Sequence, residues 1–204
     1  MSDPAALDDA EFTALDLSDL TAGEVPWLRR RFVRCDFTGA DLRELVTETC
    51  TFDECDFSGA DLGDSVHRAG AFRSCTFRRS SLGGARFSGC SLLGSALIDC
   101  RLRPATLVDC DLTLVGLGRA DLRKTDLSGL RMREANLVDA DLRECDLRDA
   151  DLTGARLQGT RFEGADLRGA RIGADGLVQA RLAGATVAAE QALAFAAAHG
   201  LRVA

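Results

Sequence analysis

The chain has 204 residues, of which 32 are acidic and 25 are basic, and its formal net charge at pH 7 is −7. This acidic balance argues against direct nucleic acid binding, which is typical of basic proteins. No apolar run approaches the roughly 20 residues that a membrane-spanning helix needs, and the acidic start MSDPAALDDAEF does not resemble a signal peptide. We therefore expect a cytoplasmic protein with no membrane partner.

Residues 1–29 are predicted to form an irregular or partly coiled N-terminal cap. Leu7, Phe12 and Leu17 already stand five residues apart, in phase with the pattern that follows. The segment TAGEVPWLRR, however, lacks the small residues that accompany that pattern further along the chain. The segment AEFTALDLSD is compatible with two early units, which a partly coiled cap would include.

Residues 30–188 repeat with a period of five. From Phe32 to Val187 the fifth-residue slot occurs 32 times, and only Thr47 and His67 in it are not apolar. A helix face repeats about every 3.6 residues and a strand face every 2, so neither explains this period. We predict that each unit is a short extended piece followed by a corner, with two side chains inside. Since one unit cannot bury its apolar residue alone, stacked units must form the core.

Glycine follows the same period. Eleven of the 20 glycines stand two places after the large apolar residue. This indicates a corner with positive φ, which glycine adopts without a Cβ penalty. Pro104 occupies the same slot, and because its φ is fixed at a negative value, that corner must use another turn type. The phase never slips, which argues against loops that project from the repeat.

The eight cysteines also obey the repeat. All of them have numbers divisible by five, and they fill the slot that alanine fills in other units. There is no CxxC spacing and no cluster of cysteine with histidine, so we interpret them as small, reduced, buried side chains and not as metal ligands. They are Cys35, Cys50, Cys55, Cys75, Cys90, Cys100, Cys110 and Cys145.

Residues 189–204 leave the five-residue period. The run AAEQALAFAAAHG is rich in alanine and ends in Gly200, which predicts a short helix with a glycine C-cap. A stack of units exposes its last coil. The helix must therefore cover that edge or bring a second subunit to it.

Signatures of enzyme chemistry are missing from the sequence. The only histidines are His67, in the large inward slot, and His199, near the end of the predicted helix. There is no phosphate-binding loop, nucleophile elbow, HExxH or dinucleotide fingerprint. We expect no catalytic residues, no cofactor and no metal, and a protein that is not an enzyme.

The units ADLRE, CDLRD, ADLTG and ADLRG resemble the pattern A(D/N)LXX of the pentapeptide repeat family. The resemblance implies an all-β solenoid, a right-handed quadrilateral β-helix with four units, or 20 residues, in each coil. For residues 30–188 this gives about eight coils, followed by the short C-terminal α-helix.

The outward charges are banded along the chain. Residues 1–65 have a net charge of −11, residues 66–106 of +6 and residues 107–204 of −2. Residues 20 apart share one face, so one column holds Asp126, Asp146 and Asp166 and another holds Asp121 and Asp141. Two interpretations remain open, since aspartate can simply suit this slot or can imitate nucleic acid phosphates. Leu93, Ile98 and Leu114 also occupy outward slots, as an apolar patch for a partner.

Several segments are similar to the mycobacterial fluoroquinolone-resistance members of the family, among them CDFTGADLRELVTE, HRAGAFRSCTF, CRLRPATL and EQALAFAAAHGL. This similarity implies a DNA-like rod that binds DNA gyrase, inhibits or modulates it and protects it from fluoroquinolones. It also implies a homodimer joined through the C-terminal helix, by Leu193, Phe195, Ala196, Ala197 and Leu201. The gyrase-facing residues of this hypothesis are Asp121, Asp126, Asp141, Asp146 and Asp166. The alternative is a repeat scaffold that binds some other protein.

Overall fold

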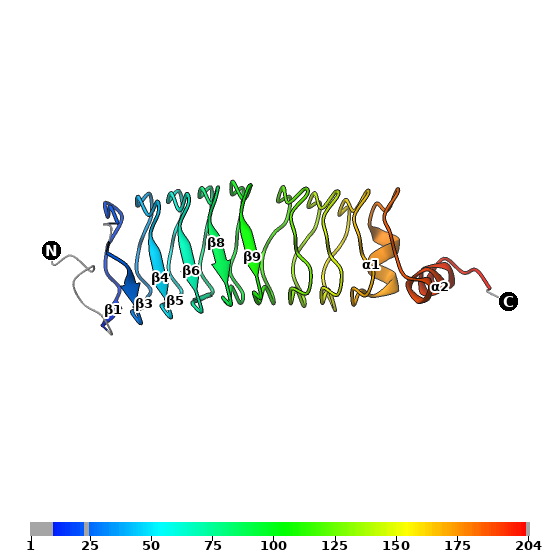
Figure 1. Cartoon of the computed structure of the whole chain (residues 1–204), viewed down its shortest axis with the longest axis horizontal. Helices are drawn as coiled ribbons and strands as arrows, with labels where there is room; N and C mark the ends of the chain where they lie inside the picture. Colours follow the sequence, from blue (N-terminus) through cyan, green and yellow to red (C-terminus); the bar gives the residue numbers. More distant parts are fainter. Residues whose placement is uncertain (1–9, 23–24, 203–204) are drawn as a thin grey trace.

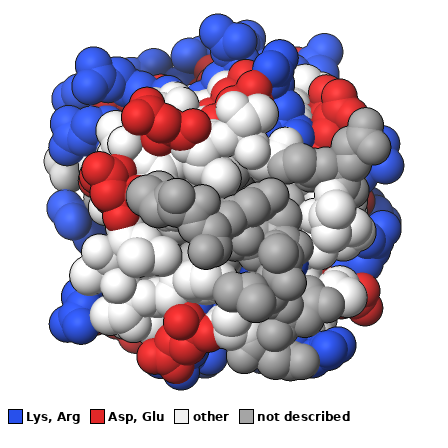
Figure 2. Space-filling view, turned by 90° about the vertical axis from the view of Figure 1, so that its left-hand side faces the viewer, with Lys and Arg blue, Asp and Glu red and all other residues white. Residues whose placement is uncertain are grey.

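The structure, a computed structural model, describes residues 10–22 and 25–202. The chain winds into an elongated rod, with the coils stacked along its length and two helices at the C-terminal end (Figure 1). Viewed from the N-terminal end, the rod has a nearly square outline (Figure 2). The fold is the expected right-handed quadrilateral β-helix.

Each coil pairs in parallel with the coil 20 residues later. The strands are β1 (Glu11–Thr13), β2 (Trp27–Leu28), β3 (Arg31–Val33), β4 (Val46–Glu48), β5 (Thr51–Asp53), β6 (Val66–Arg68), β7 (Ala71–Arg73), β8 (Arg86–Ser88) and β9 (Thr106–Val108). Two sheets result, ordered β1-β3-β5-β7 and β2-β4-β6-β8-β9. Single bridges continue the same register as far as Asp166↔Thr186. The four-unit coil is thereby confirmed.

The coil register extends into the N-terminal segment. Phe12 of β1 pairs with Phe32, and Trp27 of β2 pairs with Thr47, both in the 20-residue register. Of residues 1–29, assigned to an irregular or partly coiled cap, the described residues 10–22 and 25–29 contain coil, and the remainder lies outside the described part. Apolar side chains in phase were enough to fix the coil, although the small residues are missing.

A helix that the repeat pattern did not predict interrupts the last coils. Helix α1 (Ala174–Gln179) lies within the span 30–188 that we expected to be uniform β-helix. Leu177 keeps its place in the five-residue count and is buried from the helix. Gly176 permits the close approach, because a Cβ there would lie 2.9 Å from Leu157 Cδ1. The helix thus preserves the phase while it changes the backbone.

The corners have the backbone conformation that the glycine pattern indicated. Gly39 and Gly59 have φ values of 71° and 69°, and every glycine counted in that slot has positive φ. Other residue types adopt the same conformation at this slot, including Glu44 and Asp64. The corner therefore tolerates side chains, and glycine is favoured there but not required.

Aromatic side chains form two columns inside the N-terminal half of the rod. Successive rings of the first column lie 5.0, 5.1 and 4.7 Å apart and are nearly parallel. The second column has two spacings of 4.8 Å. The first consists of Phe12, Phe32, Phe52 and Phe72, and the second of Phe37, Phe57 and Phe77. In the C-terminal half leucine fills most of these positions.

The small inward slot has a hydrogen-bonding role. The thiols of Cys50 and Cys75 donate to the carbonyl 23 residues earlier, at 3.2 and 3.3 Å. Ser80 and Thr160 use their hydroxyl groups in the same way. All eight cysteines are free, and seven are buried. Burial raises the pKa of Cys110 to about 11, so the interpretation as interior thiols is confirmed.

His67 is an interior side chain with both ring nitrogens hydrogen-bonded. Ser65 donates its hydroxyl proton to Leu62 O at 2.7 Å and must therefore accept from His67 Nε2, at 2.9 Å. Thr47 Oγ1 then donates to Nδ1, at 2.8 Å. The ring is neutral, since burial lowers its pKa to about 3.

This histidine should make stability depend on pH. The unfolded chain binds a proton at His67 below about pH 6.5, whereas the folded chain does so only near pH 3. Stability is therefore full above pH 6.5 and falls by about 1.4 kcal/mol for each pH unit below it. When the pH is lowered from 7.5 to 5, the free energy of unfolding measured in urea should fall by about 2 kcal/mol more in the parent than in His67→Phe. Equal losses in both proteins would contradict the assignment.

Helix α2 (Ala189–Ala198) closes the C-terminal end of the rod. The amide side chain of Gln191 donates to Leu167 O and Ala170 O, at 2.9 and 2.8 Å. Its oxygen accepts from the N–H of Ala188 at 2.7 Å, which fixes the start of the helix. Gly200, with φ of 76°, ends it as expected. The helix thus covers part of the last coil.

Candidate interaction surfaces

The five aspartates singled out in the sequence lie on two faces of the rod. Bridges join Asp126 to Asp146 and Asp146 to Asp166 on one face, and Asp121 to Asp141 on the next. The structure therefore forms the two columns that the 20-residue register implied. It also surrounds them with cations.

An arginine two residues later forms a two-armed ion pair with four of the five aspartates. Arg143, for example, reaches Asp141 with Nε at 2.8 Å and Nη2 at 2.7 Å. The other pairs are Asp121 with Arg123, Asp146 with Arg148 and Asp166 with Arg168. Parallel bonds of this kind fix both side chains and largely cancel their charges. Asp126 is the exception, because it is followed by Ser128, whose N–H donates to it at 3.0 Å.

The same arginines connect one coil to the next. Arg123 Nε lies 3.8 Å from Asp141, and Arg161 Nη1 lies 3.5 Å from the same carboxylate. Hydrogen bonds from Arg168 lower the pKa of Asp166 to about 2. A column of bare aspartates would repel itself, but alternating signs remove most of that cost. The arginines therefore stabilise the columns that the aspartates alone would destabilise.

The sequence contains the signal for these pairs. The triplet DLR occurs at Asp41, Asp121, Asp141, Asp146 and Asp166, and in each case the structure pairs its first and third residues. The leucine points inward, so the two flanking side chains emerge on the same outward face. The net charges of the three long segments do not reveal these local pairs.

A different column of aspartates, near the N-terminus, has no such arginines. Bridges join Asp16 to Asp36 and Asp36 to Asp56 on one face. Backbone N–H groups of Thr38 and Ser58 donate to Asp36 and Asp56, each at 2.8 Å. Among the described residues none of these three aspartates forms an ion pair. This face therefore carries uncompensated negative charge.

The central band is basic and partly apolar. Arg78, Arg79 and Arg101 make no ion pair within the described part of the chain. Leu93 and Leu114, at neighbouring coils of one corner, are 38% and 52% exposed. Seen from the N-terminal end, Lys and Arg side chains project all around the rim of the rod (Figure 2). The outside is therefore a mosaic and not a uniformly negative cylinder.

Helix α2 presents an apolar surface at the C-terminal end. Leu193 and Leu201 are 50% and 63% exposed, and Ala197 is also exposed. Phe195 and Ala196 are half-buried, and Phe195 packs against the core. Of the five residues assigned to a dimer, three are thus accessible, Ala196 is half-buried, and Phe195 fixes the helix to the rod.

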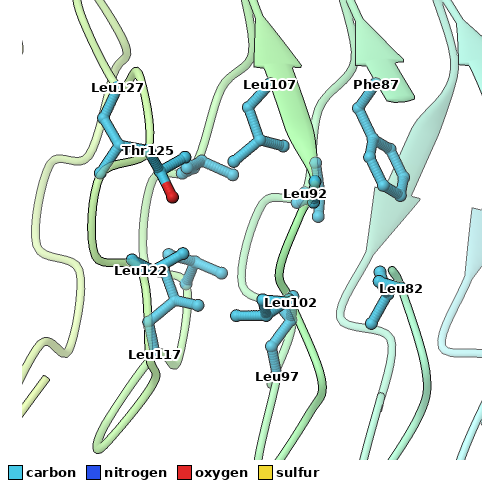
Figure 3. A pocket seen from close by; sticks show the side chains of 13 residues that line it. Leu82, Phe87, Leu92, Leu97, Leu102, Leu107, Leu117, Leu122, Thr125 and Leu127 are labelled. Carbon is cyan, nitrogen blue, oxygen red and sulfur yellow. The ribbon is translucent and has the colours of Figure 1, made fainter. Parts of the chain in front are cut away.

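Internal spaces offer little room for a ligand. The cavity in Figure 3 is lined by leucines such as Leu102, Leu107 and Leu122, and its volume of 20 Å³ is close to that of one water molecule. Within residues 10–22 and 25–202, no group of three acidic, histidine or cysteine side chains could hold a metal ion. In the same residues, neither helix has the length and apolar character to cross a membrane.

Comparisons with known proteins agree with the geometry. A family model described as pentapeptide repeats matches residues 31–66, 105–149 and 131–169, and a second of that description matches residues 52–106. No curated protein matches the chain.

Among solved structures, full-length QnrB1, a plasmid-mediated fluoroquinolone resistance protein, is similar with a TM-score of 0.82 and 20% identity, over 94% of this chain and 98% of that one. A trypsin-treated variant of QnrB1 is similar with a TM-score of 0.79 and 22% identity, over 97% of each chain. At these identities the likeness establishes the shared fold.

Proposed function

Because the chain belongs to the pentapeptide repeat family, we propose that it is a DNA mimic that binds DNA gyrase, inhibits or modulates it, and protects it from fluoroquinolones. The likeness to QnrB1 along almost the whole of both chains supports this proposal. The physical basis is a rod with acidic side chains at a regular spacing, offered to a surface that normally receives a DNA segment.

The column of Asp16, Asp36 and Asp56 is the observation that carries the proposal. Neighbouring carboxylates stand one coil, or about 4.8 Å, apart, and no arginine compensates them in the described structure. A DNA-binding groove is lined with lysine and arginine that contact phosphates. Such a groove would gain charge-assisted hydrogen bonds from this face.

The aspartates near the C-terminus have a smaller part in this proposal. Asp121, Asp141, Asp146 and Asp166 already bind arginine, so a partner must compete with an existing pair. Asp126 has no arginine two residues later, and the charge of Arg148 on the next coil acts on it. The assignment of all five to gyrase stays a prediction, and we place the stronger contact on the N-terminal column.

We propose in addition that the active form is a homodimer joined through α2. Leu193→Glu with Leu201→Glu would place carboxylates within an apolar contact, which is unfavourable without partners, and should convert a dimer into a monomer. Native mass spectrometry measures the change. Ala192→Glu is the control, since this exposed residue is not on the stripe of Ala197 and Leu201, and the variant should remain dimeric. A parent that is monomeric at micromolar concentration would exclude this dimer.

One observation favours the alternative, a repeat scaffold for another protein. Ile98 is 37% exposed and lies on the coil next to Arg79, whose backbone N–H donates to Ile98 O at 2.8 Å, a combination suited to a protein surface with apolar and acidic side chains. This patch does not resemble DNA.

A supercoiling assay with purified gyrase separates the two functions. Under the proposal, the chain inhibits supercoiling in a concentration-dependent manner and reduces the DNA cleavage that a fluoroquinolone produces. Raising the salt concentration should weaken inhibition, because screening weakens exposed charge contacts. If the folded chain had no effect on either reaction, gyrase would be excluded as its partner and the scaffold function would be favoured.

A further inference from the structure

The hydrogen-bond ladder between coils is broken at one place in the middle of the rod. On either side of it the ladder is regular, as in Leu82 N–H to Arg101 O and Leu122 N–H to Asp141 O, at 2.8 and 2.9 Å. Between residues 98–109 and 118–129, the corresponding inter-coil bonds are missing. The N–H groups concerned are those of Asp99, Leu102, Leu107, Asp109, Asp121 and Asp126.

The break affects only two of the four faces. On the other two, the same coils remain joined by Leu92 N–H to Asp111 O and Leu97 N–H to Gly116 O, both at 2.8 Å. In Figure 1 the coil after β9 stands further from β9 than other neighbouring coils stand from each other, most clearly at the top. The two stacks are thus attached along one side and separated along the other.

Pro104 supplies a physical reason. At the equivalent corner of neighbouring coils, Asp64 N–H donates to Gly83 O at 3.0 Å and Lys124 N–H donates to Arg143 O at 3.0 Å. Proline has no N–H, so the bond from position 104 to the next coil cannot form. The gap in the ladder surrounds this position.

Packing is also loosened at the break. The small slot is buried in most coils, but Cys100, Ala105 and Thr125 are partly exposed there. The aromatic side chain Phe87 is followed in register by Leu107, and the leucine-lined cavity lies at this step (Figure 3). Side chains that border a void have fewer dispersion contacts to hold them in place.

From these observations we propose that the rod is hinged at the break. Residues 11–97 and 111–187 would move as two stacks about the two intact faces, because a repeat rod deforms where the contact between neighbours is weakest. The ion pair between Arg103 and Asp121, at 3.5 Å, joins the open side. The two side chains are 37% and 48% exposed, so solvent screens the pair and it resists opening only weakly.

The hinge would regulate the proposed function, on which this part of the inference rests. It lies between the acidic column of Asp36 and Asp56 and the aspartates of the C-terminal stack. Bending changes the angle between these surfaces. A partner with a curved groove would therefore select one curvature of the rod.

Distances between paired spin labels test the hinge. Labels at Glu44 and Lys124 span the break on its open side, and labels at Glu54 and Glu134 span it on the intact side. All four residues are exposed corner residues with positive φ, and each pair is 80 residues apart. The background is Cys100→Ala, since alanine fills this slot in other coils. We expect a clearly broader distance distribution for the pair on the open side than for the pair on the intact side. Pro104→Gly should narrow the distribution of the open-side pair.

Amide exchange of the unlabelled chain provides a second measurement. The amides of Leu102, Leu107, Asp121 and Asp126 should exchange about 100-fold or more faster than those of Leu82 and Leu122, since they open without global unfolding. The hinge would be overturned if the two label pairs had equally broad distance distributions, or if the two sets of amides exchanged at equal rates. Neither measurement involves gyrase, so a rigid rod and a failed gyrase assay are separate results.

Discussion

Phe52→Ala is expected to lower the free energy of unfolding by about 3 to 5 kcal/mol, the usual cost of truncating a buried phenylalanine. Phe52 is 1% exposed and lies between Phe32 and Phe72, with ring centroids 5.1 and 4.7 Å away. The substitution leaves a cavity and interrupts the aromatic column. Urea denaturation followed by circular dichroism measures the loss.

Phe162→Ala is the matched control for the contribution of the column. Phe162 is fully buried, but no aromatic ring contacts it in the described structure. Its loss should cost less than that of Phe52, by about 1 to 2 kcal/mol, since aromatic pairs add about 0.5 to 1.5 kcal/mol each. Equal losses would show that the stacked rings contribute only their buried area.

The double substitution Asp36→Asn with Asp56→Asn should weaken inhibition of gyrase roughly tenfold or more. Each lost surface contact is worth up to about 1 kcal/mol, and 1.4 kcal/mol corresponds to a factor of ten. Asparagine keeps an oxygen that can accept from Thr38 N–H and Ser58 N–H, so the corners should persist. The concentration for half-inhibition of supercoiling is the measured quantity.

Asp141→Asn with Asp146→Asn is the control of equal net charge. Both changes alter the total charge by the same amount, but Asp141 and Asp146 already bind Arg143 and Arg148. We expect a smaller effect on inhibition. An equal or larger effect would contradict our placement of the stronger contact and favour the original five-aspartate assignment.

The sequence predicts the coil because the period is carried by the side chains that build the core. The slot of Phe32 and Leu167 is buried along most of the described rod, and its spacing reveals the geometry directly. Helix α1 escapes the same analysis because Leu177 stays in phase. A pattern of inward residues cannot distinguish two backbones that deliver the same side chain to the same place.

The outer surface was harder to predict, since it depends on pairs and not on periods. Asp141 belongs to an acidic column, but Arg143, two positions later on the same face, neutralises its charge. Likewise, the sequence marks Pro104 as an unusual corner. The loss of the inter-coil hydrogen bonds of Leu102 and Asp121, however, is seen only when the position of the neighbouring coil is known. Local charge balance and missing backbone donors therefore have to be assessed between coils.

The contact of Gln191 with the last coil has a consequence for assembly. A bare solenoid end would accept the first coil of another molecule, and each addition would leave a new bare end, so fibres could grow without limit. Gln191 occupies the carbonyls of Leu167 and Ala170, which removes part of that template. Association at this end then has to use the helix, and a pair of helices about a two-fold axis is complete with two copies. In the proposed dimer, the length of the rod would be set by two copies of the chain and not by the protein concentration.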